Sequence, residues 1–162
     1  MWHDGTPLSS EDIKIDFYCK MLMGWWEGKV IKHIETPDKH TVVFHCRRIP
    51  KEFLLFKILA DTPILVQAKK YKDFIPPNIE ELAERAYWLK DAEALKELET
   101  WRKKLEDHKP PLEEYVGLGP YTIAYYTDTE ILFKKFEKHL LKKCIRLKIL
   151  TIIIAFTILI CL

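Results

Sequence analysis

Apolar residues recur at intervals of three and four positions near the start of the chain, as they do along one face of an amphipathic helix. The members of this pattern are Ile13, Phe17, Met21 and Leu22. Ser9 can cap the helix, because Asp12 follows three residues later and completes an approximate capping box. The pattern therefore predicts a helix over residues 10–23, which Gly24 ends.

Two runs rich in β-branched residues follow, over residues 30–35 and 41–46. Such runs are typical of strands, and the residues between them carry strong turn signals. Pro37 and Asp38 suit the two central positions of a tight turn. We therefore predict a β-hairpin that turns at these two residues.

The middle of the chain changes from apolar to highly charged. An apolar run predicts a short buried helix over residues 52–59, and a second run predicts a core strand over 64–66. Residues 78–107 predict one long solvated helix, for which Asn78 is a suitable cap. Its apolar stripe consists of Leu82, Leu89, Leu95, Leu98, Trp101 and Leu105. Its first turns carry charges typical of a solvated face, namely Glu80, Glu81, Glu84 and Arg85.

A corner rich in glycine and proline, at residues 117–120, precedes two further strand patterns over 121–126 and 131–136. Segments typical of helices and of strands alternate along the chain without a regular βαβ repeat. The pattern therefore predicts an α+β fold, or mixed α/β.

The end of the chain combines a basic stretch with an apolar run from Ile149 to Leu162. As a helix this run would extend about 21 Å, short of the ~30 Å hydrocarbon core of a bilayer. Snorkelling lysines favour a short membrane anchor, whereas an extension without a selected role explains the run equally well. We therefore separate residues 140–162 as a tail from a domain over residues 2–139.

Composition and charge narrow the function classes. The chain has 162 residues, 48% hydrophobic and 31% charged, which is the balance of one globular domain. A net charge of +2 gives no electrostatic argument for nucleic-acid binding, so none is expected. Gln67 and Asn78 are the only side-chain amides, a bias typical of proteins from hot environments. The residues after Met1 lack the pattern of a secretory signal, so we expect no export signal in the chain as written.

The sequence holds no pattern typical of an enzyme or a metal site. No two cysteines have the spacing of a metal knuckle or a redox motif, and the six histidines lack the pairing found in metalloproteases. A Gly-x-Ser-x-Gly elbow and a phosphate-binding glycine loop are also missing from the sequence. We therefore expect no catalytic residue, no metal and no cofactor.

Three blocks of sequence have distinctive turn chemistry and a distinctive order. They are Trp2-His3-Asp4-Gly5-Thr6-Pro7 with the cap that follows it, residues 35–44, and residues 117–121. Their structural residues are Asp4, Gly5, Pro7, Asp12, Pro37, Asp38, Gly117, Gly119, Pro120 and Tyr121. In this order the blocks resemble family 5 of the extracellular solute-binding proteins, the oligopeptide-, dipeptide- and nickel-binding components of ABC importers. The resemblance extends to about residue 139 and leaves the tail without an interpretation.

The resemblance implies part of the first lobe of a type II periplasmic-binding-protein clamshell. It implies a peptide or similar small solute as ligand, an ABC permease as partner, and an extracytoplasmic location at the cell surface or in the periplasm. Clamshell proteins bury their ligand between two lobes, so a fragment of one lobe is expected to bind weakly or not at all.

Four aromatic residues are the candidates for solute contact, namely Trp25, Trp26, Tyr125 and Tyr126. Aromatic side chains line many binding grooves, but packing against the lobe core explains these four as well. An alternative function of another class is also open. The chain would then be a small membrane-associated interaction protein, anchored by residues 149–162 and presenting its charged helix to a partner.

Overall fold

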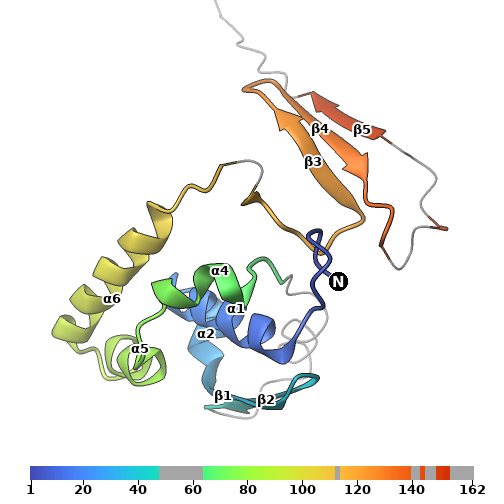
Figure 1. The fold of residues 1–162 in the computed structure, drawn as a ribbon. Coiled ribbons are helices and arrows are strands. Elements are labelled where there is room, and N and C mark those ends of the chain that lie inside the picture. Colours follow the sequence, from blue (N-terminus) through green and yellow to red (C-terminus); the bar gives the residue numbers. More distant parts are fainter. Residues whose placement is uncertain (48–63, 112–113, 140–142, 145–148, 154–162) are drawn as a thin grey trace, which may run out of the picture. The chain divides into compact units, whose positions relative to one another are not determined.

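The computed structural model describes residues 1–47, 64–111, 114–139, 143–144 and 149–153. The predicted α+β class is confirmed, because helices and two small antiparallel sheets make up these residues. The chain forms two compact units, drawn in Figure 1. A helical unit contains residues 8–109, and a sheet unit contains residues 1–7 together with 110–162.

Helix α1 (Ser10–Leu22) is the centre of the helical unit. The other elements are α2 (Trp26–Val30), β1 (Ile31–Asp38), β2 (Thr41–Cys46), α4 (Ala68–Tyr71), η2 (Lys72–Phe74), α5 (Ile79–Tyr87) and α6 (Ala92–Glu106). Helix α1 contacts both strands and each of these α-helices. Its predicted capping box is confirmed, because Ser9 and Asp12 each bond the other's backbone N–H through their side chains.

The burial of α1 differs from the expected single apolar face. Nearly its whole circumference is buried, including the polar residues Asp12, Asp16 and Lys20, which are four positions apart. The carboxylates on this stripe accept backbone hydrogen bonds from the segment that runs beside the helix. Asp16 Oδ1 accepts the N–H groups of Leu65 (2.7 Å) and Val66 (3.1 Å). Asp12 Oδ1 accepts the N–H of Ala68 (2.8 Å).

These contacts also correct the strand expected over residues 64–66. The segment has no regular secondary structure, and the carboxylate of Asp16 satisfies two of its N–H groups instead of a neighbouring strand. The helix expected over residues 52–59 lies outside the described residues.

The hairpin of β1 and β2 forms where the sequence predicts it, but its turn lies two residues later. Pro37 and Asp38 belong to β1, Asp38 pairs with Thr41, and Lys39 and His40 make the turn. Asp38 stabilises this turn by accepting the N–H of His40 (2.7 Å). This hydrogen bond is the main reason why the pKa of Asp38 lies below its usual value.

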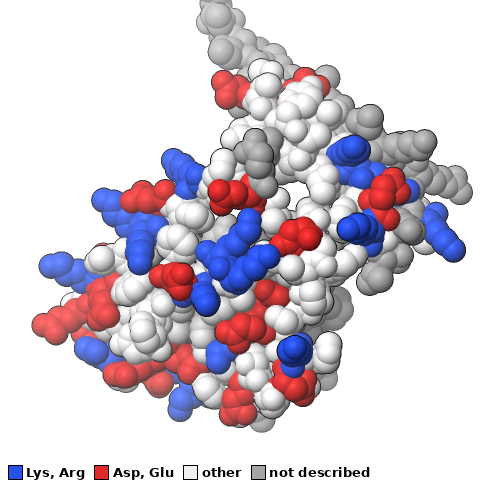
Figure 2. All heavy atoms as spheres, viewed as in Figure 1, with Lys and Arg blue, Asp and Glu red and all other residues white. Residues whose placement is uncertain are grey.

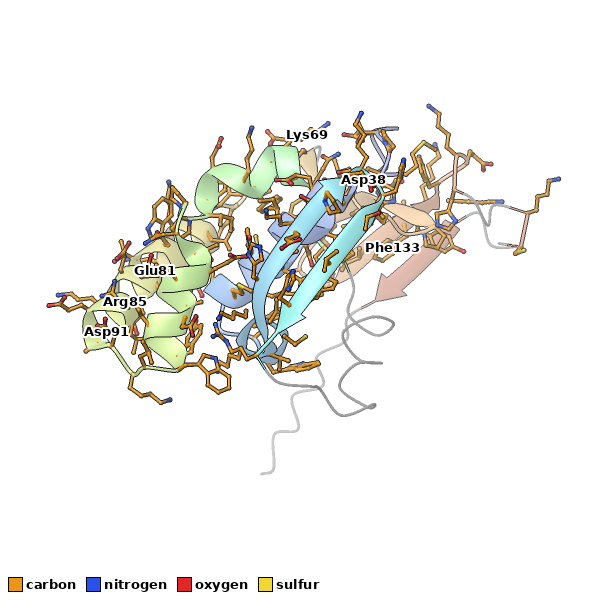
Figure 3. The ribbon with its side chains drawn as sticks, turned by 90° about the horizontal axis from the view of Figure 1, so that it is seen from below. Asp38, Lys69, Glu81, Arg85, Asp91 and Phe133 are labelled. Atoms are coloured by element: carbon orange, nitrogen blue, oxygen red, sulfur yellow. The ribbon has the colours of Figure 1, made fainter. Side chains whose placement is uncertain are left out.

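The single charged helix expected over residues 78–107 is two helices. The chain breaks between α5 and α6, where Lys90 takes a positive φ of 58°. Asp91 caps α6 by accepting the N–H groups of Glu93 and Ala94, and its second oxygen accepts two hydrogen bonds from Arg85 of α5 (Figure 3). Asn78 takes the cap position of α5 but makes no capping hydrogen bond with its side chain.

Acidic and basic side chains alternate over the surface seen in Figure 2.

Glu80 departs from the solvated helix face that the sequence suggests. Its Oε1 accepts the hydroxyl of Tyr18 (2.6 Å) and the N–H of Ile34 (3.0 Å). Its Oε2 lies 2.6 Å from Nδ1 of His33. Glu80 of α5 therefore joins α1 and β1 at the edge of the core. The largest fully buried apolar residues of this core are Phe17, Met21, Leu22, Ile31, Ile34, Ile79, Leu82 and Leu98.

The sheet unit contains β3 (Tyr121–Tyr126), β4 (Glu130–Lys135) and β5 (Ile149–Ile153), antiparallel and in the order β3-β4-β5. The first two strands are those that the sequence predicts. The third is not among the predicted strands, because its residues begin the apolar run that the sequence analysis assigns to the tail. The domain boundary at residue 139 stays a prediction. Among the described residues, every helix is too short or too polar to span a bilayer.

Candidate functional site

A pocket of about 270 Å³ opens in the helical unit beside the second half of α1. Three stretches of chain line it, namely α1 with the loop after it, residues 65–71, and the C-terminal end of α6 with the residues that follow. The lining includes the side chains of Asp16, Cys19, Lys20, Trp25, Leu65, Val66, Tyr71, Leu105, Glu106 and His108. The surface of the pocket is mostly apolar.

One part of the lining is a buried ion pair. The side chains of Asp16 and Lys20 are 2% and 4% exposed, and Oδ2 of Asp16 contacts Nζ of Lys20. Nζ of Lys20 also lies 4.7 Å from the centre of the Phe17 ring. Since Asp16 uses its other oxygen for two backbone N–H groups, both oxygens of this carboxylate are engaged. The pair therefore presents little uncompensated charge to a ligand.

Aromatic rings form much of the remaining lining. Trp25, in the loop after α1, is 44% exposed. Tyr71 and His108 lie edge to face, with ring centres 5.6 Å apart, and Phe74 packs against His108 at 4.5 Å. Edge-to-face and tilted contacts of this kind hold rings in fixed orientations. The rings of Tyr71 and His108 therefore give this side of the pocket a defined aromatic surface.

The thiol in the lining is not poised for chemistry. Burial raises the pKa of Cys19 to about 12, the charge of Asp16 adds to the effect, and Lys20 offsets part of it. Such a thiol stays protonated at neutral pH, and the thiolate is the nucleophilic form. Across the described ranges, no group of three or more His, Cys, Asp or Glu side chains could hold a metal ion.

The four aromatic residues expected to contact a solute belong to two different units. Trp25 lines the pocket, whereas Trp26, which begins α2, is exposed and is not part of the lining. Tyr125 and Tyr126 lie on β3 in the sheet unit, 40% and 59% exposed. The hydroxyl of Tyr125 donates to Glu130, and this hydrogen bond is the main cause of the raised pKa of Tyr125. A ligand contact for any of the four stays a prediction.

Tyr71 and His108 were missed at the sequence level. Neither residue lies in a motif, and 37 positions separate them in the sequence. Only the folded chain brings them to the same pocket as Trp25. The sequence offered no signal for this grouping, because the three lining stretches follow different local patterns.

The opening turn and the glycine corner meet in the sheet unit. Gly5 takes a positive φ of 86° in the predicted turn, and Asp4 accepts the N–H and hydroxyl of Thr6. Nδ1 of His3 accepts the N–H of Gly117 (3.1 Å), and Nε2 lies 2.9 Å from the carbonyl oxygen of Gly119. Because an N–H only donates and a carbonyl only accepts, His3 is held as the neutral tautomer with its proton on Nε2.

The rest of the corner leads directly into the sheet. The carbonyl of Pro120 accepts the N–H of Phe136 (2.8 Å), and Tyr121 pairs with Lys135 as the first residue of β3. Gly119 has no heavy atom within 4 Å of where a Cβ would lie. A structural role for the corner residues as a group stays a prediction.

The cap of α1 meets the hairpin turn in the helical unit. The N–H of Ser10 donates to the carbonyl of Lys39 (3.0 Å), and the hydroxyl of Ser10 donates to the carbonyl of Asp38 (2.5 Å). Pro7 is the last residue of the sheet unit's first segment, and the cap follows in the helical unit. The first block of sequence thus supplies contacts to both units.

Comparison with known proteins is informative about the fold. The structure is similar to a periplasmic oligopeptide-binding protein of an oligopeptide ABC transporter from Thermotoga maritima, with a TM-score of 0.56 and 19% sequence identity. The alignment covers 96% of this chain and 25% of that chain, so this chain spans about a quarter of its neighbour's length. No family model and no curated protein matches the sequence. At this identity the likeness shows a shared fold.

Proposed function

We propose that this chain is part of the first lobe of a family 5 solute-binding protein, which serves an ABC importer of peptides or a similar small solute. The observation that carries the proposal is the fold shared with a periplasmic oligopeptide-binding protein over 96% of this chain. Three sequence blocks that resemble family 5 lie within the same region. The neighbour is a binding protein of a transporter, so we propose no enzymatic activity.

The contacts among the three blocks add physical support. The opening turn bonds to the glycine corner through His3, and the cap of α1 bonds to the hairpin turn through Ser10. Chance sequence similarity gives no reason for the matching segments to touch. A shared scaffold does give such a reason, because turn chemistry is selected where segments must pack.

The proposal places the protein outside the cytoplasmic membrane, with an ABC permease as its partner. It also sets the expected affinity. The chain spans 25% of the neighbour's length. A clamshell protein gains most of its affinity by burying the ligand between its two lobes. The chain alone should therefore bind peptides weakly or not at all.

Two measurements test this function. The DNA on both sides of the coding sequence should encode an export signal, the second lobe and permease subunits. Isothermal titration of the chain with a mixture of short peptides should give no micromolar affinity. Flanking DNA without any lobe or permease gene would argue against the importer, and micromolar binding would show that the chain is not an incomplete lobe.

A further inference from the structure

We propose that the pocket beside α1 binds the aromatic side chain of a peptide, and that the helical unit alone is sufficient for this. The inference rests on the proposed function in one respect, namely that the natural ligand is a peptide. It goes beyond that function by assigning a side-chain subsite that needs no second lobe. The described lining residues all belong to residues 16–108, within a single compact unit.

The volume of the pocket suits one ring. A dry apolar cavity of about 150 Å³ is large enough to bind benzene. The pocket has about 270 Å³, so it accommodates a phenyl or phenol ring with its methylene group. It is smaller than the range of about 300–1,000 Å³ that is typical of pockets enclosing a whole drug-sized ligand. The size therefore favours a single side chain over an entire peptide.

The chemistry of the lining selects an aromatic group. Trp25, Tyr71 and His108 present rings from three different stretches of chain. Aromatic pairs prefer offset or edge-to-face contacts, which add to the gain from burying apolar area. Because packing against Phe74 and Tyr71 already orients His108, a ligand ring meets a partly preorganised surface.

The charges of the lining argue against an acidic side chain. Asp16 already pairs with Lys20, so the cation is not available to a second carboxylate. Glu106 also lines the pocket, is exposed, and adds negative charge. Among the described lining residues, a carboxylate in the pocket would therefore meet repulsion from Glu106 while Lys20 is engaged by Asp16. A neutral ring avoids this cost.

The test uses the whole chain and N-acetyl-phenylalanine amide as the probe. Burial of one ring in an open pocket supports a dissociation constant on the order of millimolar. NMR titration should shift the indole N–H signal of Trp25. The indole N–H of Trp88 donates to the carbonyl of Lys29 outside this pocket and should stay unchanged. N-acetyl-alanine amide and N-acetyl-aspartate amide should each bind at least about fivefold more weakly.

Two adjacent tryptophans supply matched variants. Trp25→Ala should weaken binding of the probe about fivefold or more, and Trp26→Ala should leave it unchanged, although both residues are exposed. Tyr71→Ala, followed by the chemical shifts of the probe itself, is a second test from another stretch of the lining. Far-UV circular dichroism should show that each variant is folded.

The proposal is overturned if the Trp25 signal does not move, if the alanine and phenylalanine amides bind equally, or if Trp26→Ala weakens binding as much as Trp25→Ala. These outcomes are separate from those that test the importer. Flanking DNA without importer genes would remove the peptide as natural ligand but leave a measured ring-binding pocket. Importer genes beside a chain that does not bind the probe would remove only the subsite.

Discussion

Glu80 shows how one residue can hold three elements together. Burial acts to raise the pKa of this carboxyl, but the hydrogen bonds from Tyr18, His33 and the N–H of Ile34 outweigh burial and keep the pKa below its usual value. The same contact contributes to the raised pKa of Tyr18, although burial is the larger cause there. A carboxylate whose pKa is lower in the folded state stabilises the fold while it is ionised.

We expect Glu80→Gln to lower the free energy of unfolding by about 1–3 kcal/mol at pH 7, because charged hydrogen bonds are lost or weakened. The stabilisation is fully present above the unfolded pKa, near 4.3 for a glutamate, and is lost as pH falls through the lowered folded pKa. In urea titrations at several pH values, the difference between the two proteins should therefore begin to shrink as the pH falls below about 4.3, and should vanish only below the lowered folded pKa. The exposed neighbour Glu81 is the control, and an equal loss for Glu81→Gln would contradict the assigned role.

Gly117 and Gly119 test the contact between the opening turn and the glycine corner. A Cβ on Gly117 would lie 3.0 Å from Cε1 of His3, whereas a Cβ on Gly119 would meet no heavy atom within 4 Å. We expect Gly117→Ala to displace the His3 ring and Gly119→Ala to leave it in place. The ring ¹⁵N shifts of His3 should report one fixed tautomer in the parent and in Gly119→Ala, and a changed pattern only in Gly117→Ala.

At the scale of elements, α1 is unusual because its polar stripe is buried with its apolar residues. Removing one partner of a buried ion pair typically costs about 3–5 kcal/mol, since the other charge stays behind without compensation. We therefore expect Asp16→Asn to destabilise the helical unit by about that amount. Adding Lys20→Met should recover part of the loss, because no buried charge then remains at this pair.

Urea unfolding of the two single variants and the double variant gives the coupling energy between Asp16 and Lys20. Glu11→Gln on the exposed side of α1 is a suitable control. A double variant whose loss equals the sum of the single losses would show that the pair does not act as a unit.

Sequence reasoning succeeded where local signals decide the structure. Four predicted features depend on residues a few positions apart, and all four form: the capping box of α1, the hairpin of β1 and β2, the strands β3 and β4, and the opening turn. Sequence reasoning failed where residues far apart in the sequence determine the local structure. The segment 64–66 is not a strand, because Asp16, about fifty positions earlier, accepts two of its N–H groups.

The break at Lys90 and the strand β5 were missed for other reasons. Lys90 is flanked by Trp88, Leu89 and Asp91, with no glycine or proline nearby, so no local signal predicts its positive φ. Residues 149–153 begin an apolar run, and such a run fits a buried strand and a helix equally well until its partner is known. Trp25, one of the four candidates for solute contact, lines the pocket, but the sequence does not predict which residues fold beside it.

At the scale of the molecule, the chain leaves the sheet unit after Pro7 and returns to it at Pro110. The helical unit is therefore an insertion between two segments that fold together. Because the His3 contacts join those segments, the opening turn closes the long loop that contains the helical unit. Removal of residues 1–6 should thus loosen the glycine corner, while the helical unit keeps its cap and core.

The pairing of β5 with β4 bears on any encounter with lipid. In the sheet, residues 149–153 pair with Glu130 through Lys134. Within hydrocarbon, a single segment can hydrogen-bond all of its own backbone N–H and C=O groups only as a helix. We expect the amides that bond β5 to β4, on both strands, to exchange equally slowly with and without anionic vesicles. If residues 149–153 left the sheet to enter the bilayer, the β4 amides that bond to them would lose their protection.

Residues 149–153 therefore cannot pair with β4 and lie in a bilayer at the same time. As the outer strand they cover one edge of β4, and any route that draws them into lipid must uncover that edge to water or to another chain. Membrane attachment through this part of the tail would then leave the edge of β4 unpaired, and an unpaired strand edge promotes self-association.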